Sequence, residues 1–149
     1  MISDFHKLDI WRRSRAHVKS IYILTSKFPD SEKYGLISQM RRASVSVPSN
    51  IAEGAGRRHV KEFEQFLQIA IASLCEIETQ LYLANDLALI EEKDIQPLLV
   101  ETTEIRKMFG INTKLLNVNK YSFRILTQQC SHKLMYHYGN PKASIEIFL

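Results

Sequence analysis

Apolar side chains recur at three- and four-residue steps along most of the chain, and this spacing is typical of amphipathic helices. In the first such stretch the repeating positions are Leu8, Trp11, Val18, Tyr22 and Thr25, and the stripe is widened by Ile21, Leu24 and Phe28. Pro29 ends the stretch, because proline lacks the amide proton that would continue a helix. The pattern therefore predicts a first helix over residues 7–27.

Three further stretches carry the same spacing, and we predict helices over residues 31–54, 59–89 and 92–117. Helices joined by short connections pack most simply as an antiparallel up-down-up-down four-helix bundle. The fold expected from the sequence is thus all-α, with the bundle in residues 1–118. It is followed by a C-terminal extension, residues 119–149, for which no regular structure is predicted.

Several residues in or beside the second predicted helix affect where it begins, bends and ends. Asp30 or Ser31 is a suitable cap for its start. Pro48 lies inside it, removes one helical amide and predicts a kink at this point. Gly54 and Gly56 stand near its end and suit a left-handed C-terminal turn.

Charge is divided unevenly along the chain. Residues 1–61 hold 12 Lys/Arg and 5 Asp/Glu, a net charge of +7, whereas residues 62–118 hold 4 and 10, a net charge of −6. Residues 119–149 hold 4 Lys/Arg and 1 Asp/Glu, and the whole chain carries +4. A basic half beside an acidic half fits either an anionic partner or self-association of basic face with acidic face.

The basic half contains the side chains that a nucleic acid would contact. Arg and Lys are suited to phosphate groups. Because no aromatic residues are interleaved with them, such binding would be to the backbone, salt-dependent and weakly sequence-selective. The alternative is a solvated face with ion pairs inside the bundle. The candidate phosphate-binding residues are Arg12, Arg13, Arg41, Arg42, Arg57, Arg58 and Lys61.

Three polar residues of the bundle, Asn50, Glu53 and Glu76, are predicted to be structural. Polar groups in a bundle are retained when they pair with one another, and such pairs can fix helix register. Arg42 is the expected partner of Glu53 or Glu76. The dispersed histidines His6, His17 and His59 are expected at the surface or at helix ends.

No arrangement in the sequence supports catalysis or a cofactor. No Glu is followed three residues later by His, as a di-iron bundle requires, and no phosphate-cradling Gly-Lys loop is present. Cys130, His132 and His137 lie close together but lack the fourth ligand of a structural zinc site. We therefore expect a non-enzymatic protein without metal or cofactor.

The expected location is the cytoplasm. The two cysteines form no spaced disulfide framework, which favours a reducing compartment. We see neither a signal-peptide pattern nor an apolar run of membrane-spanning length, so no membrane partner is expected.

Several motifs of the chain are more specific than its periodicity. They are EKYGL at residues 32–36, QMRRA at 39–43, SVPSNIAEG at 46–54 and FEQFLQIAIASLCEIETQL at 63–81. Together they resemble the 23S rRNA-intervening-sequence protein family over about residues 5–117. The string that contains Pro48 is the most specific, because propensity alone would not select proline and polar residues inside a helix.

The resemblance implies a four-helix bundle that assembles as a homo-oligomer, specifically a homopentamer with a basic surface. Related accessory proteins of diversity-generating retroelements bind nucleic acid and a reverse transcriptase. The implied partners are ribosomal RNA or another nucleic acid, and a reverse transcriptase if the chain is associated with a retroelement. We expect a nucleic-acid-associated accessory or scaffold protein, with RNA as the first choice. The alternative is a protein–protein interaction module without a nucleic-acid partner.

Overall fold

The structure is a computed structural model that describes residues 4–115. Its elements in chain order are the 3-10 helix η1 (Phe5–Lys7), α1 (Asp9–Thr25), the 3-10 helix η2 (Asp30–Glu32), α2 (Leu36–Ala55), α3 (Val60–Asp86) and α4 (Glu92–Leu115). Over this range all regular structure is helical and no strand occurs. The predicted extension, residues 119–149, lies outside the described residues.

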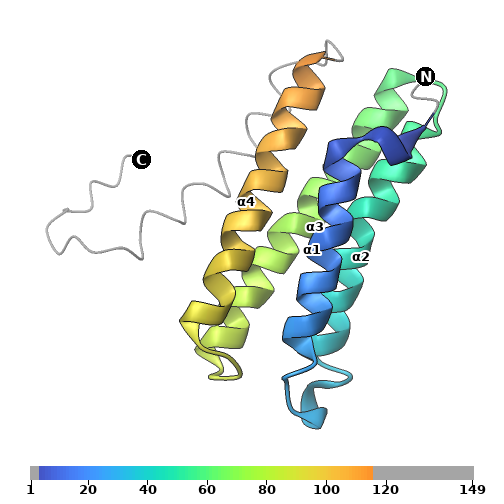
Figure 1. Cartoon of the computed structure of the whole chain (residues 1–149). Coiled ribbons are helices and arrows are strands. Elements are labelled where there is room, and N and C mark those ends of the chain that lie inside the picture. Colours follow the sequence, from blue (N-terminus) through green and yellow to red (C-terminus); the bar gives the residue numbers. More distant parts are fainter. Residues whose placement is uncertain (1–3, 116–149) are drawn as a thin grey trace, which may run out of the picture. The chain divides into compact units, whose positions relative to one another are not determined.

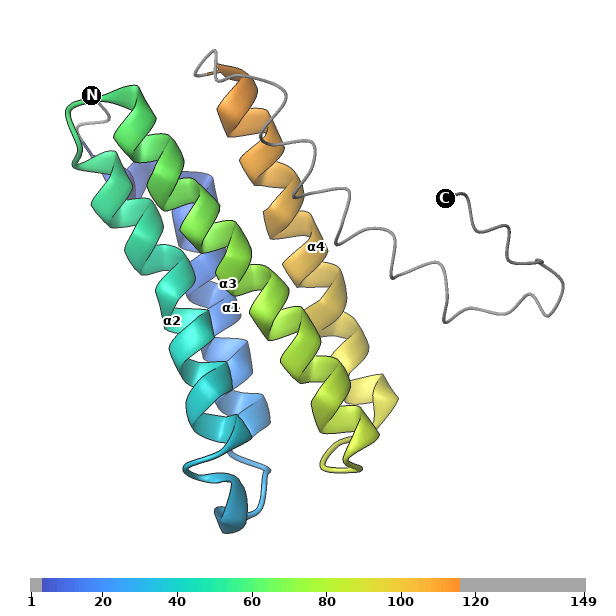
Figure 2. The ribbon, with the colours of Figure 1, turned by 180° about the vertical axis from the view of Figure 1, so that it is seen from behind.

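The four α-helices form an antiparallel bundle. Consecutive helices run in opposite directions, as the colour gradient along each ribbon shows in Figure 1 and, from behind, in Figure 2. Helix α1 packs against α2 and α4, and α3 packs against the same two helices. This cyclic arrangement confirms the predicted four-helix bundle.

A single apolar core runs along the bundle, and all four helices contribute to it. Apolar positions at three- and four-residue steps are buried in the last three helices, for example Met40, Val47 and Ile51 in α2. The largest fully buried side chains are Ile21, Met40, Val47, Ile51, Leu67, Ile71, Leu74, Ile77, Leu81, Ile95, Ile105 and Phe109.

The buried face of α1 agrees with the predicted stripe at Ile21, Leu24 and Thr25 and differs from it elsewhere. Ile10, Ser14 and His17 are buried, whereas Trp11 is only partly buried and the Tyr22 side chain is 42% exposed. Trp11 and Tyr22 lie at the edge of the buried face. There a large ring can pack against neighbouring side chains without fitting into the narrow core. Because His17 is buried inside α1, the prediction that it lies at the surface or at a helix end is wrong.

Helix α2 begins later than predicted and crosses Pro48 without interruption. Residues 30–32 form η2 instead of the first turn of α2, and Gly35 is the N-cap residue. A carboxylate oxygen of Glu32 accepts the amide proton of Leu36 at 3.0 Å, which satisfies one of the free amides at the helix start.

The two glycines at the end of α2 do not make the predicted left-handed turn. Gly56, the C-cap residue, has a φ of −78°, which any residue adopts. Gly54 is instead required by close packing, because a Cβ atom there would lie 2.7 Å from the Phe63 ring and 2.7 Å from Cβ of Phe66. The absence of a side chain at Gly54 lets α2 and α3 approach each other closely.

The left-handed turn occurs at the end of α3 instead. Ala88 has a φ of 53° and is the one non-glycine residue with a positive φ in the described chain. The amide of Leu89 donates to the carbonyl of Ala84 at 3.0 Å, and that of Ala88 to Asn85 at 2.9 Å. This pair of hydrogen bonds is the Schellman motif, which ends α3 at Asp86, before the predicted residue 89.

Candidate nucleic-acid interface

The turn between α2 and α3 presents three of the predicted phosphate-binding residues together. Arg57, Arg58 and Lys61 are all exposed there. A guanidinium nitrogen of Arg57 contacts a carboxylate oxygen of Glu53 at 2.5 Å, and the same guanidinium lies over the Phe66 ring, 4.8 Å from its centroid. Arg58 and Lys61 have no ion-pair or hydrogen-bond partner within residues 4–115. This turn therefore carries cationic groups that are available to a ligand.

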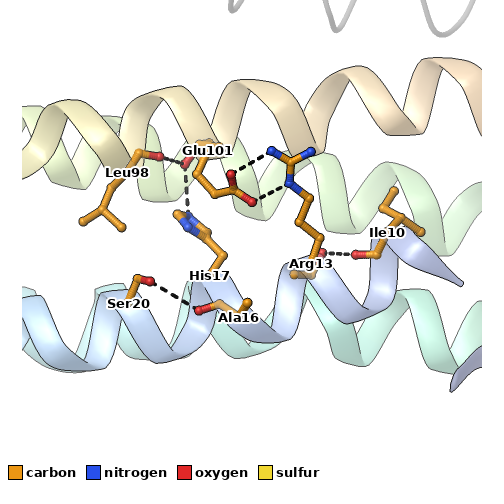
Figure 3. Close-up of polar contacts among 9 residues, drawn as sticks. Ile10, Arg13, Ala16, His17, Ser20, Leu98 and Glu101 are labelled. Atoms are coloured by element: carbon orange, nitrogen blue, oxygen red, sulfur yellow. Dashed lines mark hydrogen bonds and ion pairs between the residues drawn. The ribbon is translucent and has the colours of Figure 1, made fainter.

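Two predicted residues of α1 are engaged by carboxylates of the protein. Arg12 contacts Asp9 at 2.5 Å one turn earlier in the same helix. Arg13 reaches across to α4 and donates from Nε and Nη2 to the two carboxylate oxygens of Glu101 at 2.6 and 2.9 Å (Figure 3). Hydrogen bonding from Arg13 lowers the pKa of Glu101 below its ordinary value. Arg13 thus links α1 to α4 and is not a free cation.

The remaining two predicted cations lie nearer the start of α2, away from the turn. Nε of Arg41 donates to Oγ1 of Thr25 at 2.9 Å, and its guanidinium lies 4.7 Å from the centroid of the Tyr22 ring. Arg42 is exposed, and the structure shows no ion pair for it among the described residues. The structure therefore does not bring all seven residues into one surface.

The expected link from Arg42 to Glu53 or Glu76 is not formed. Glu53 instead contacts Arg57 one turn later, and Glu76 accepts a hydrogen bond from Nε2 of Gln80 at 2.9 Å. All three side chains of the predicted link are exposed to solvent. Partners four residues away in the sequence satisfy both carboxylates at a lower cost in side-chain entropy than a bridge between helices.

Asn50 takes part in a polar contact between α2 and α3. Its Nδ2 donates to the backbone oxygen of Ser46 at 2.8 Å and lies 3.0 Å from Oγ of the same residue. The Ser46 hydroxyl also meets the hydroxyl of Ser73 across the helix interface at 2.8 Å. Ser46 and Asn50 flank Pro48 in α2, and Ser73 meets this stretch from α3.

His17 is the most deeply buried titratable group of α1, with 3% of its surface exposed. Oγ1 of Thr102 donates to the carbonyl of Leu98 at 2.8 Å, so this oxygen accepts the proton of His17 Nε2 at 3.1 Å (Figure 3). Nδ1 is then an acceptor, and it has no partner within the described residues. Burial lowers the pKa of His17 to about 4, while the charge of Glu101 opposes this shift.

A second buried polar link, between Glu78 of α3 and Arg106 of α4, was not predicted. Nη1 of Arg106 donates to Oε2 of Glu78 at 2.6 Å, and both residues are buried. A signal for it exists in the sequence, because Glu78 lies four residues after Leu74 and three before Leu81, on the apolar stripe of α3. Arg106 has the same spacing from Thr102 and Phe109 in α4. Charges at such positions need partners, because an unpaired charge in the interior is costly.

Two further observations concern other classes of site. Within the described part of the chain, no group of three His, Cys, Asp or Glu residues is placed to hold a metal ion. Cys130, His132 and His137 lie outside that part. None of the described helices combines the length and the apolar character that crossing a membrane requires.

Taken together, the fold and the candidate interface define an all-helical, four-helix-bundle protein with a basic turn at one end. The chain matches the family described as 23S rRNA-intervening sequence protein over residues 6–110. The protein belongs to this family, as the motifs around Pro48 predicted. No curated protein matches the sequence.

Proposed function

We propose that this protein is a non-enzymatic accessory or scaffold protein that binds the phosphate backbone of a nucleic acid, with RNA as the first choice. The observation that carries the proposal is the α2–α3 turn, where Arg58 and Lys61 are exposed and unpaired in the described structure beside Arg57. Cationic side chains without carboxylate partners can contact phosphates without first breaking a bond within the protein.

A single copy of this turn should bind RNA weakly, because its few cations neutralise few phosphates. In a homo-oligomer the same turn recurs in every subunit, and several weak contacts to one RNA combine into a much higher overall affinity. The proposal therefore joins the basic turn to the homo-oligomer that the family resemblance implies.

Filter binding of a structured RNA at two salt concentrations tests this function. Replacing Arg58 and Lys61 with alanine should weaken binding and lower the slope of log affinity against log salt by about 2, roughly 1 for each lost contact. Lys33→Ala is the matched control, because Lys33 is an exposed cation at the other end of the bundle that has no carboxylate partner within residues 4–115. Absence of RNA binding by the natural protein at low salt would reject the proposal.

A second candidate function, self-association as a protein–protein module, is favoured by the position of the charges in the bundle. Residues 1–61, with net charge +7, include all of α1 and α2, which are neighbours. Residues 62–118, with net charge −6, include nearly all of α3 and α4. One side of the bundle is therefore basic and the opposite side acidic, which suits contacts between copies. Sedimentation at low and high salt tests it, and a monomer at both would reject it.

A further inference from the structure

Three rings gather at the start of the described chain, where Lys7 stands between them in the sequence and Arg12 directly follows the third. Phe5 and His6 stack with a centroid distance of 4.1 Å and an interplanar angle of 27°. Trp11 meets both edge-on, at 5.0 Å from Phe5 and 5.1 Å from His6. The guanidinium of Arg15 lies 4.8 Å from the centroid of Trp11. We call Phe5, His6, Trp11 and Arg15 the aromatic cluster.

The aromatic cluster is open to solvent on its His6 side. The His6 side chain is 66% exposed, whereas Phe5 and Trp11 are partly buried. Both rings of η1, Phe5 and His6, contact Trp11 of α1, and of the three rings that of His6 is the most exposed. An exposed aromatic ring stacked on a second ring offers a flat face to a planar ligand.

Acidic neighbours do not make the aromatic cluster strongly negative. Asp4 accepts hydrogen bonds from the amide of His6 at 3.1 Å and pairs with the His6 ring at 2.9 Å, and Lys7 lies 3.7 Å from its other oxygen. Asp9 is paired with Arg12. Each carboxylate thus has a cation or donor beside it, and Arg15 adds a positive charge over Trp11.

The aromatic cluster and the basic turn belong to the same end of the bundle. Helix η1 contacts α2 as well as α1. In both Figure 1 and Figure 2 the first residues of the described chain lie beside the turn that joins α2 to α3. Flat aromatic surface and the exposed cations Arg58 and Lys61 therefore occur on neighbouring segments.

We propose that this end of the bundle binds single-stranded nucleic acid, with an unpaired base stacked on the exposed face of the His6–Phe5 pair while Arg58 and Lys61 contact phosphates. This proposal rests on the proposed function and narrows its ligand class. In a duplex the faces of the bases are already stacked on one another, so only a single strand or a loop presents a free face. The aromatic cluster thus adds base stacking to a backbone contact that would otherwise accept duplex and single strand alike.

Trp11 is the only tryptophan of the chain, so its fluorescence reports directly on the aromatic cluster. The full-length protein is titrated with a single-stranded 12-nucleotide oligouridylate and, separately, with an RNA duplex of equal phosphate count. The single strand should bind about fivefold or more tightly than the duplex, the difference expected from roughly one stacked base. It should also change the Trp11 emission, which the duplex should leave nearly unchanged.

Three variants separate stacking from charge. His6→Ala should reduce the affinity for the single strand about fivefold or more and leave the duplex affinity unchanged. His6→Phe keeps an aromatic face without the hydrogen bond to Asp4, so it should retain the affinity for the single strand. The matched control is Tyr34→Ala, which removes an 88% exposed ring with Lys33 over it from the opposite end of the bundle.

The possible outcomes distinguish this proposal from the one it rests on. Equal affinities for single strand and duplex, with Trp11 emission and the His6→Ala variant unaffected, would overturn base stacking while phosphate binding by the basic turn survives. Failure of both RNAs to bind at low salt would overturn both proposals. Loss of affinity in Tyr34→Ala equal to that in His6→Ala would also overturn the assignment to this end of the bundle.

Discussion

Gly54 sets the distance between α2 and α3 at one point of their interface. A Cβ atom there would meet the Phe63 ring and Cβ of Phe66 at 2.7 Å, well inside normal contact distance. Gly54→Ala should therefore force the helices apart or push Phe63 from its position. We expect a loss of about 1–3 kcal/mol in the free energy of unfolding, measured by urea denaturation.

Gly56→Ala provides the control for this prediction. The nearest atom to a Cβ there is the carbonyl oxygen of Glu53 at 3.4 Å, an ordinary contact, and the backbone φ of −78° suits alanine. Its unfolding free energy should match or slightly exceed that of the natural protein. If both variants had the same stability, close packing at Gly54 would not be the reason for the glycine.

Ala88 presents the opposite case, an alanine where glycine fits better. Its φ of 53° is a left-handed conformation that L-residues other than Asn and Asp rarely adopt. Ala88→Gly should raise the free energy of unfolding by about 0.5–1 kcal/mol, because relief of this strain outweighs the added freedom of the unfolded chain. Thermal unfolding checks it. Ala72→Gly, at an exposed position inside α3, should instead lower stability by about 1 kcal/mol.

At the scale of the elements, the α1–α4 interface contains two polar contacts, one between His17 and Thr102 and one between Arg13 and Glu101. His17 has a folded-state pKa of about 4, below the ordinary value of 6.5. The unfolded chain therefore binds more protons between these two values, and stability falls as the pH is lowered from about 6.5 to about 4. The loss should approach roughly 3 kcal/mol, measured as urea midpoints across this pH range.

His17→Leu tests whether this residue causes the pH dependence. Thr102 would still donate its proton to the carbonyl of Leu98, so no donor is left without a partner. The variant should show a much flatter stability profile between pH 6.5 and 4. Below that range both proteins should lose stability as Glu101, whose pKa is lowered by Arg13, takes up a proton. An unchanged slope would assign the pH dependence to other groups.

The sequence predicts the helices well because each has a periodic apolar stripe. It predicts the ends of the helices less well, because these depend on contacts with other parts of the folded chain. Gly54 looked like a residue for a turn, since its close approach to α3 is invisible until the helices are packed. His17 looked like a surface residue because a histidine alone gives no indication of Thr102, 85 positions later. The basic turn could be predicted because its cations are close together in the sequence. The ion pair of Arg13 could not be predicted, because its partner Glu101 comes from α4.

At the scale of the whole molecule, the bundle divides its cations into two groups. Those that face carboxylates, such as Arg13 and Arg57, stabilise helices and interfaces. Within residues 4–115, those without an ion-pair partner include Arg58 and Lys61 at the α2–α3 turn and Arg42 in α2. A count of basic residues therefore overestimates the number of cations that the proposed RNA contact could use, because the net charge of the first two helices includes cations that are already paired with carboxylates.

The bond between Arg13 and Glu101 has a consequence for the order in which the protein folds. It joins residues 88 positions apart, whereas α2 and α3 are neighbours connected by a short turn. Closing so long a segment costs more chain entropy than forming the α2–α3 hairpin, so α1 and α4 should meet late, after the transition state. Arg13→Ala should then accelerate unfolding in stopped-flow urea experiments and leave the refolding rate nearly unchanged. A slower refolding rate instead would place the meeting of the two outer helices early on the folding pathway.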